Sequence, residues 1–262
     1  MIYLNLYKII EVFNETVFVL ARVLSLIVCI PIFGEKFLNK KIKILFSIFI
    51  SFLYSSFFYQ DNYISIFSSI GFLIFLEQII IGIFLGFLIQ LIFSIPIIIG
   101  EIISLQIGLS LSTVFDITQK WNSSVFSYFI KIFILMIFFS NNGHFWIIYI
   151  IFNSFKYIPI KSFYFSKDIF FSTLSFFSKV FYSGVILVIP IIIIILILNI
   201  MMFFLNKAIP QFSVFSIFLP ALLLIGLLIL YYYIPINLNN FCNLLQNMFE
   251  QINNFQKNII IY

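Results

Sequence analysis

The sequence has little charge and few reactive side chains. Only 9% of its 262 residues are charged, and it contains one histidine and two cysteines. Soluble domains carry about 25% charged residues, because a globule must cover its exterior with polar groups. The shortage of charge therefore excludes a soluble globular enzyme. Together with a hydrophobic content of 63% and a net charge of only +5, it also excludes a disordered protein and a nucleic-acid-binding protein.

The residue patterns that carry chemistry are absent as well. The sequence has no glycine-rich phosphate loop, no Ser/His/Asp arrangement, no Cys/His cluster and no paired catalytic carboxylates. Cys29 and Cys242 have no partner at metal-binding or redox spacing. His144 has no neighbour suited to metal binding or acid–base work. We therefore expect no catalytic residue, no metal and no cofactor, and we do not expect an enzyme.

What the sequence has in excess is apolar residues in long runs. Phenylalanine alone occupies 39 positions. A helix needs about 20 residues to cross the hydrocarbon core of a bilayer. The pattern predicts an all-α integral membrane protein with about six hydrophobic segments. They lie near 12–33, 42–59, 64–99, 125–160, 176–205 and 211–236.

Two of these runs do not fit single upright spans. The run 64–99 is too long for one span, and the run 125–160 is interrupted by the turn-forming Ser140-Asn141-Asn142-Gly143-His144. That turn predicts a hairpin with arms of about 16 residues, which is short for crossing a bilayer. The linkers are too short to hold a soluble domain. We therefore expect helical hairpins packed among other apolar subunits.

A few polar side chains lie inside the apolar runs, where they are costly. A charge at mid-bilayer costs about 2.5–3.5 kcal/mol on insertion scales. Arg22 lies deep in the first run, so we expect a carboxylate or carbonyl partner for it. Glu77, beside Gln78, has two open interpretations: a proton or ion site, or a hydrogen bond to a helix of a neighbouring subunit. No second acid follows at helical spacing, which favours the hydrogen bond.

Small residues mark two further places. Gly82 and Gly86 form a Gly-x-x-x-Gly pattern, which lets helix backbones approach closely and predicts a packing role. The stretch from Gly100 to Asp116 mixes small, hydroxylated and apolar residues without an evident period. Irregular backbone at membrane depth is tolerated only where protein buries it or where it lines a cavity. A constriction and an interfacial loop are both compatible with this composition.

Several short motifs follow one another along nearly the whole chain. They are Arg22-Val23-Leu24 with Pro31, Lys40-Lys41-Ile42-Lys43, Gln78-x3-Gly82-x3-Gly86 with Gln90, Gly100-Glu101 to Gly108-Leu109-Ser110 with Asp116, Asn142-Gly143-His144-x-Trp146, and Leu205-Asn206-Lys207-x-x-Pro210-Gln211 with Ser213, Phe215 and Pro220. In these motifs the chain resembles the FliR family of flagellar biosynthesis proteins, which shares ancestry with the equivalent subunit of type III injectisomes. It departs from the family at Ser104, where glycine is common, and at Ile117, where proline is frequent.

The resemblance implies a channel-forming subunit of the flagellar type III protein export gate. Such a subunit looks like a FliP-like portion, here about 1–175, followed by a FliQ-like portion, here about 176–262. It assembles with FliP and FliQ subunits, and FlhB and FlhA are further export components. The expected location is the bacterial inner membrane, in the flagellar basal body. There the gate would conduct unfolded rod, hook and filament proteins outward.

The resemblance also implies roles for particular residues. In this family the loop matching 106–116 helps to plug the closed channel, and a dry apolar constriction blocks ions. The residues expected in or near the constriction are Gly108, Leu109, Leu111, Val114, Phe115 and Asp116. The residues expected at buried polar assembly contacts are Arg22, Glu77, Gln78, Glu101 and Asn206.

Two alternatives differ in function. The first is the equivalent subunit of an injectisome, which neighbouring genes for needle and effectors would indicate. The second is an ion-coupled transporter of small molecules centred on Glu77 and Glu101, which predicts transport by the purified chain alone.

Overall fold

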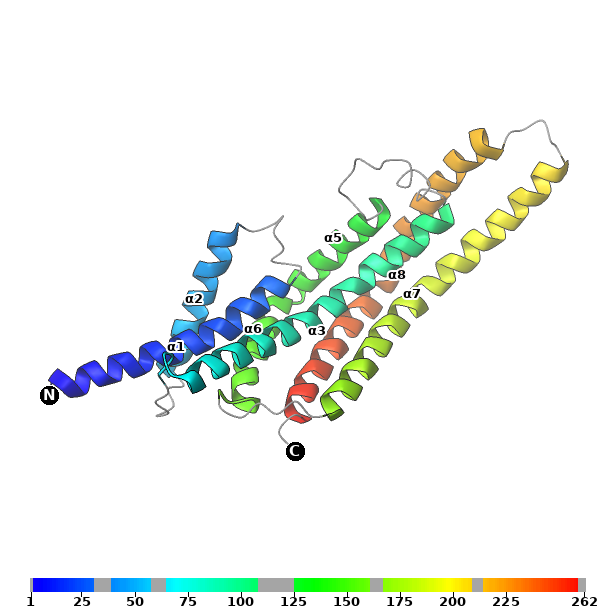
Figure 1. The fold of residues 1–262 in the computed structure, drawn as a ribbon. Helices are drawn as coiled ribbons and strands as arrows, with labels where there is room; N and C mark the ends of the chain where they lie inside the picture. The colour runs from blue at the N-terminus through cyan, green and yellow to red at the C-terminus, as the bar shows by residue number, and fades with distance from the viewer. Residues whose placement is uncertain are drawn as a thin grey trace. The chain divides into compact units, whose positions relative to one another are not determined.

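A computed structural model describes residues 2–30, 39–57, 65–107, 125–160, 167–208 and 214–258. Within these ranges the regular structure is entirely helical, which confirms the predicted all-α class (Figure 1). The helices are α1 (Ile2–Cys29), α2 (Lys40–Phe57), α3 (Ser69–Ile107), α5 (Val125–Ser140), α6 (Gly143–Tyr157), α7 (Lys167–Ala208) and α8 (Val214–Asn258).

The chain divides into two compact units, each built from separate stretches of sequence. Unit 1 comprises Met1–Leu91, His144–Leu174 and Phe249–Tyr262, and unit 2 comprises Ile92–Gly143 and Ser175–Met248. The helices α3 and α8 therefore contribute residues to both units. The division of the chain into FliP-like and FliQ-like portions is a matter of ancestry rather than of contacts, and it stays a prediction.

In unit 1, α8 is joined to α6 by polar and aromatic contacts. The Gln256 amide donates a hydrogen bond of 3.2 Å to the Ile150 carbonyl oxygen, and the Asn153 amide donates one of 3.0 Å to Asn253 Oδ1. The ring of Phe249 stacks on Trp146 with 6.4 Å between the centroids. These contacts explain why α8 continues to Asn258, although the apolar run predicted from the sequence ends near 236.

The helix α2 has a polar inner side and an apolar outer side. Its buried face, which packs against α1, carries Lys43 and the serines at 47, 51 and 55. Each serine hydroxyl donates to a carbonyl of its own helix, so the three serines are satisfied locally. Ile48, Phe49 and Phe52 are exposed on the outside. This inversion of the soluble pattern requires an apolar environment around the helix.

In unit 2, α3 packs against α5 and α7. The Phe93 and Phe138 rings meet edge to face with 5.2 Å between their centroids. A Cβ added to Gly184 on α7 would lie 3.5 Å from Ile95, which is ordinary van der Waals contact. The Asn141 amide donates a hydrogen bond to Cys242 Sγ on α8 at 3.0 Å. These contacts build a second core of its own.

The structure corrects one expectation for the stretch from Gly100 to Asp116. Its first part, to Ile107, is helical and completes α3. Gly100, Ile103, Ser104 and Ile107 are all buried, and they recur at the i, i+3, i+4 and i+7 spacing of one helix face. The period is therefore present, but small residues at 100 and 104 conceal it in a hydropathy reading. Residues 108–116 lie outside the described ranges.

The predicted break within 125–160 is confirmed. The helix α5 ends at Ser140 and α6 begins at Gly143, giving arms of 16 and 15 residues. Asn142 has a φ of 55°, a left-handed conformation that asparagine tolerates better than most residues. A Cβ on Gly143 would overlap the Phe138 ring, so the glycine there is required by packing.

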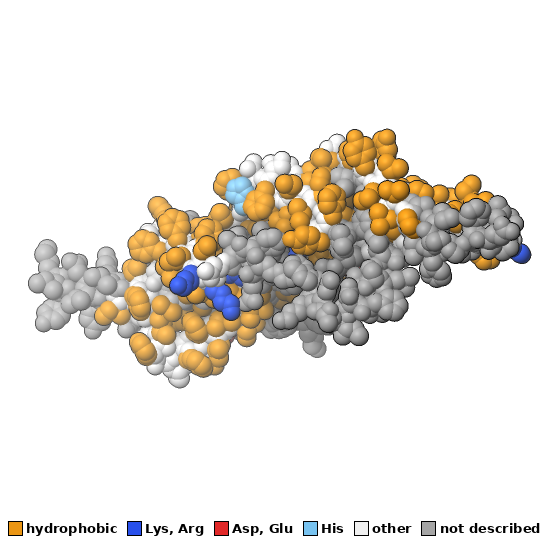
Figure 2. All heavy atoms as spheres, turned by 90° about the horizontal axis from the view of Figure 1, so that it is seen from above, with side chains coloured by type: hydrophobic (Ala, Val, Ile, Leu, Met, Phe, Trp, Pro, Cys, Tyr) orange, Lys and Arg blue, Asp and Glu red, His pale blue; other side chains and the backbone are white. Residues whose placement is uncertain are grey.

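Candidate membrane spans are fewer than the six segments predicted. Among the described residues, three helical stretches are long and apolar enough to cross a bilayer: Ile10–Cys29, Ser69–Ile107 and Phe171–Leu205. Two bent pairs, α5 with α6 and the two parts of α8 around Pro235, raise the count to five if each is one span. The helix α2 is not among them, and its first turn carries three lysines. Figure 2 shows hydrophobic side chains over much of the described surface.

Candidate functional site

The largest fully buried side chain that the structure describes is that of Arg22 on α1, in unit 1. Arg22 is 1% exposed, and its neighbour Gln78 on α3 is not exposed at all. The Nε atom of Arg22 donates a hydrogen bond of 2.8 Å to Gln78 Oε1, and Nη2 donates to the same oxygen. The Nη1 atom donates one of 2.9 Å to the Ser154 carbonyl oxygen on α6. One side chain thus joins three helices.

Aromatic rings complete the surroundings of this guanidinium. The Arg22 Cζ atom lies 4.2 Å from the centroid of the Phe155 ring, within the range of a cation–π interaction. The Tyr54 ring of α2 lies 4.5 Å from Phe155, centroid to centroid. The Gln78 amide in turn donates a hydrogen bond of 3.3 Å to the Ile160 carbonyl oxygen. The cluster therefore fixes four helices of unit 1 and the turn that follows α6.

The arginine cluster is held by neutral oxygen atoms. The carbonyl partner expected for Arg22 is found in both the Gln78 side chain and the Ser154 backbone. A buried charge without a partner is very costly, so each of these oxygens contributes to holding the guanidinium inside. Arg22 and Gln78 are enclosed within one chain. Their hydrogen bonds accordingly stabilise unit 1 itself.

Next to this cluster, α1 and α3 approach closely at Gly82 and Gly86. A Cβ added to Gly82 would overlap Ser25 Oγ and the Arg22 carbonyl oxygen. A Cβ added to Gly86 would lie 2.9 Å from the Leu26 carbonyl oxygen and would overlap Cys29 Cβ. The backbone of α1 thus occupies the space that side chains at these two positions would need. This close approach brings Gln78 within reach of Arg22.

In unit 2, the two helices that flank residues 108–124 are joined at their ends. A Cβ on Gly100, near the end of α3, would overlap the backbone of Ser127 in the first turn of α5. The Ser127 hydroxyl donates a hydrogen bond of 2.6 Å to Glu101 Oε1. A Cβ on Gly226 of α8 would overlap the Ile107 side chain. The end of α3 thus packs against both the start of α5 and α8.

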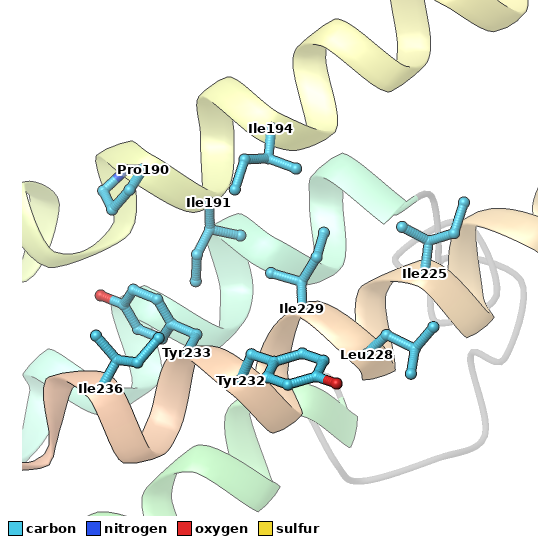
Figure 3. Close-up of a pocket in the computed structure, with 9 residues that line it drawn as sticks. All are labelled: Pro190, Ile191, Ile194, Ile225, Leu228, Ile229, Tyr232, Tyr233 and Ile236. Carbon is cyan, nitrogen blue, oxygen red and sulfur yellow. The ribbon is translucent and has the colours of Figure 1, made fainter.

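An apolar groove of about 310 Å³ lies between α7 and α8 in unit 2 (Figure 3). The residues that line it are Pro190, Ile191, Ile194, Ile225, Leu228, Ile229, Tyr232, Tyr233 and Ile236. Pro190 has no N–H, so the preceding turn lacks one helical hydrogen bond. The Tyr233 hydroxyl donates to the Leu187 carbonyl oxygen of that turn. The exposed groove is therefore apolar and suits no polar substrate.

Only some of the predicted site residues are described by the structure, and their contacts differ. All six residues expected at the constriction, from Gly108 to Asp116, lie outside the described ranges, and so does the side chain of Asn206. Glu101 is half-buried and bonded to Ser127. Glu77 is half-buried on α3 and has no hydrogen bond or ion pair with any other residue that the structure describes.

Sequence reasoning missed Ser154, Phe155 and Ser127. Ser154 acts through its backbone carbonyl, which any residue provides, so no side-chain pattern marks it. Phe155 is one of 39 phenylalanines and carries no distinguishing signal. Ser127 lies in the first turn of α5 and becomes significant only because Gly100 lies against it.

The described part of the chain offers no constellation for chemistry. No three His, Cys, Asp or Glu side chains within it gather in a way that could hold a metal ion. The two polar clusters, around Arg22 and around Glu101, join helices rather than presenting a reactive group to a cleft. What the arrangement can do is hold helices together, including the end of α3 and the start of α5.

Comparison with known proteins gives consistent matches over most of the chain. The profile of bacterial export proteins, family 1, matches residues 13–248. A flagellar biosynthetic protein FliR of Buchnera aphidicola subsp. Baizongia pistaciae (strain Bp) is 41% identical over 215 residues, 82% of this chain and 83% of that protein. The same-named protein of Buchnera aphidicola subsp. Acyrthosiphon pisum (strain APS) is 39% identical over 97% of this chain and 98% of its own. That of Escherichia coli (strain K12) is 31% identical over 92% and 90%.

Proposed function

The chain belongs to the family of bacterial export proteins, family 1, which includes the flagellar proteins named FliR, and we propose that it is a channel-forming structural subunit of the flagellar type III protein export gate. In this proposal it serves export of rod, hook and filament proteins, and so flagellum assembly, without catalysing a reaction. It shares the gate with FliP-like and FliQ-like subunits, contacts an FlhB-like component and works together with an FlhA-like component. It lies in the bacterial inner membrane, in the flagellar basal body.

Beside the family membership, the main observation behind the proposal is the exposed apolar surface of α7. The stretch Phe171–Leu205 is the most apolar of the candidate spans, yet only 17% of its most apolar part is buried within the chain. Exposed apolar surface on this scale needs lipid or other subunits to cover it. The inverted helix α2 makes the same demand in unit 1.

The junction at the ends of 108–124 supports the plug role proposed for that loop. Gly100 packs against Ser127, and Ile107 packs against Gly226, so the end of α3 and the start of α5 are held in place on either side of residues 108–124. A plug must be held at its base, yet it must give way to an extended chain. In the proposal Leu109, Leu111, Val114 and Phe115 form the apolar obstruction, and Gly108 gives the backbone freedom to move.

Co-purification with gate subunits tests the proposal. The tagged chain would be expressed together with the FliP-like and FliQ-like proteins of the same genome, extracted in mild detergent and imaged as particles. We expect one stable complex with a central channel. The isolated chain in liposomes is expected to move no solute. Recovery of the chain without either subunit, or solute transport by the chain alone, would overturn the proposal.

The flagellar assignment is supported over the injectisome alternative by the names of the relatives described above, which are flagellar. The gene neighbourhood provides an independent test. Adjacent genes for ring, rod and hook proteins are expected, and adjacent genes for a needle and effectors would favour the injectisome instead.

A further inference from the structure

The first half of α3 exposes a regular row of apolar side chains in unit 1. These residues, the seam, are Leu73, Leu76, Ile80, Ile83 and Phe87, and they are between 41% and 60% exposed. They follow one another at intervals of three, four, three and four residues. The opposite face of the same segment, including Ile81 and Leu85, is buried.

This spacing allows the seam to pack against a second helix. Apolar residues alternating at three and four positions repeat every 3.5 residues on average, and such a row packs knobs-into-holes against a partner helix. Most helix pairs in membranes cross at about +20°, as soluble coiled coils do. Because any single face of a helix shows these intervals, the seam by itself suits lipid as well as a partner helix, and Glu77 decides between the two.

Glu77 lies at the edge of the seam. It follows Leu73 by four residues and precedes Ile80 by three, which is the flanking e position if Leu73 is taken as a. Glu77 is half-buried among apolar neighbours and makes no hydrogen bond or ion pair with any residue that the structure describes. It lies eight residues into a candidate membrane span, about 12 Å along the helix at 1.5 Å per residue. A carboxylate there requires a partner.

We propose that the seam binds an apolar membrane-spanning helix of another gate subunit, and that this helix carries a lysine or arginine facing Glu77. Charges at flanking positions set the choice and orientation of a partner helix. A second copy of α3 would not satisfy Glu77, because Ser69–Ile107 contains no lysine or arginine. The inference rests on the function proposed above and adds the chemistry of the partner.

Charge substitution at Glu77 in the co-expressed complex tests the proposal. Glu77→Lys is expected to lower the recovery of other subunits with the tagged chain about tenfold or more, because it places two like charges together. Glu77→Gln should lower it less, because it only leaves the partner charge unpaired. The matched control is Glu250→Lys, which reverses an exposed carboxylate of α8 in the same unit and should leave recovery unchanged.

Photo-crosslinking on the otherwise unchanged chain avoids any effect of the Glu77 substitutions on folding. A photo-crosslinking amino acid in place of Ile83 should form an adduct with a helix of another gate subunit. A charge swap then checks the pairing. Changing the lysine or arginine that lies opposite Glu77 on the partner helix to glutamate should restore recovery of the Glu77→Lys complex. The control position is Ile74, which is 7% exposed on the same helix and should form no adduct with another chain.

The outcomes separate this inference from the function on which it rests. If the wild-type chain recovers no gate subunit, the proposed function fails, whatever Glu77 does. If the wild-type complex forms, but Glu77→Lys recovers it equally well, the charge pairing is refuted. If the photo-crosslinking amino acid at position 83 forms adducts only with lipid, the contact between the seam and a partner helix is refuted.

Discussion

Replacing Gln78 by leucine is expected to lower the free energy of unfolding of unit 1 by about 3 kcal/mol. Leucine has a similar volume and removes the oxygen that accepts two hydrogen bonds from Arg22. The guanidinium stays 1% exposed and loses its main acceptor, so part of its charge becomes uncompensated in the core. A hydrogen bond to a charged group contributes about 1.5–3 kcal/mol, and Arg22 loses two of them. The lower part of that range applies, since the Ser154 carbonyl and the Phe155 ring still contact Arg22.

A double substitution separates two contributions to this destabilisation: the unpaired charge of Arg22 and the loss of packing. In Arg22→Met with Gln78→Leu, both polar groups become apolar, a change that is often neutral when both partners are replaced. The double variant should therefore be more stable than Gln78→Leu alone. The coupling free energy between the two sites is expected to be about 1–3 kcal/mol.

Unfolding of the full chain in detergent micelles by increasing SDS measures these differences. Trp146 stacks on Phe249 in unit 1, so its fluorescence reports on that unit once Trp121→Phe has removed the other tryptophan. The reasoning is wrong if Gln78→Leu changes the unfolding free energy by less than about 0.5 kcal/mol, the usual range of neutral surface changes. It is also wrong if the double variant loses more unfolding free energy than the two single variants lose together.

Three further predictions concern packing and gating. Gly82→Ala should reduce the amount of folded chain in size-exclusion profiles, because the added Cβ overlaps the Arg22 carbonyl oxygen. The control Gly184→Ala, whose Cβ makes only ordinary contacts, should be tolerated. Equal profiles for the two variants would contradict the close approach of α1 and α3. Ser104→Ala should raise the unfolding free energy by about 1 kcal/mol, since the buried Ser104 hydroxyl has no hydrogen-bond partner among the described residues; a decrease would contradict this. Leu111→Ala with Phe115→Ala should make the closed gate leak ions, and unchanged membrane conductance in cells carrying the variant complex would refute the apolar plug.

The sequence was sufficient for the features that depend on a single element. The break between α5 and α6 follows from Asn142 and Gly143, which tolerate the turn. The apolar runs predicted helices, because a chain in a bilayer must satisfy its backbone within each segment. A carbonyl or carboxylate partner for Arg22 followed from the cost of a buried charge. Each of these inferences needs only local composition and a general energetic rule.

Features that depend on pairs of distant elements were not predictable from the sequence. The partner of Arg22 on α6 is a backbone carbonyl 132 residues away, and backbone atoms leave no trace in a sequence. The last part of α8 is only moderately apolar, yet it is helical because Phe249 and Gln256 find contacts on α6. The helical end of α3 was mistaken for irregular chain, since Gly100 and Ser104 occupy buried positions where hydropathy expects large apolar residues.

These failures share a physical cause. In water, burial of apolar surface separates inside from outside, so hydropathy reveals the core. Here the exterior of α2 and α7 is as apolar as the interior, and hydropathy cannot distinguish them. The interior is marked instead by small and polar residues, such as Ser47 on α2 and Gly82 on α3, which permit close approach or find a partner. Exchange among isoleucine, leucine and phenylalanine on the outer faces should accordingly cost unit 1 little. The relative positions of α1, α2 and α3 within unit 1 depend on a few polar and small side chains.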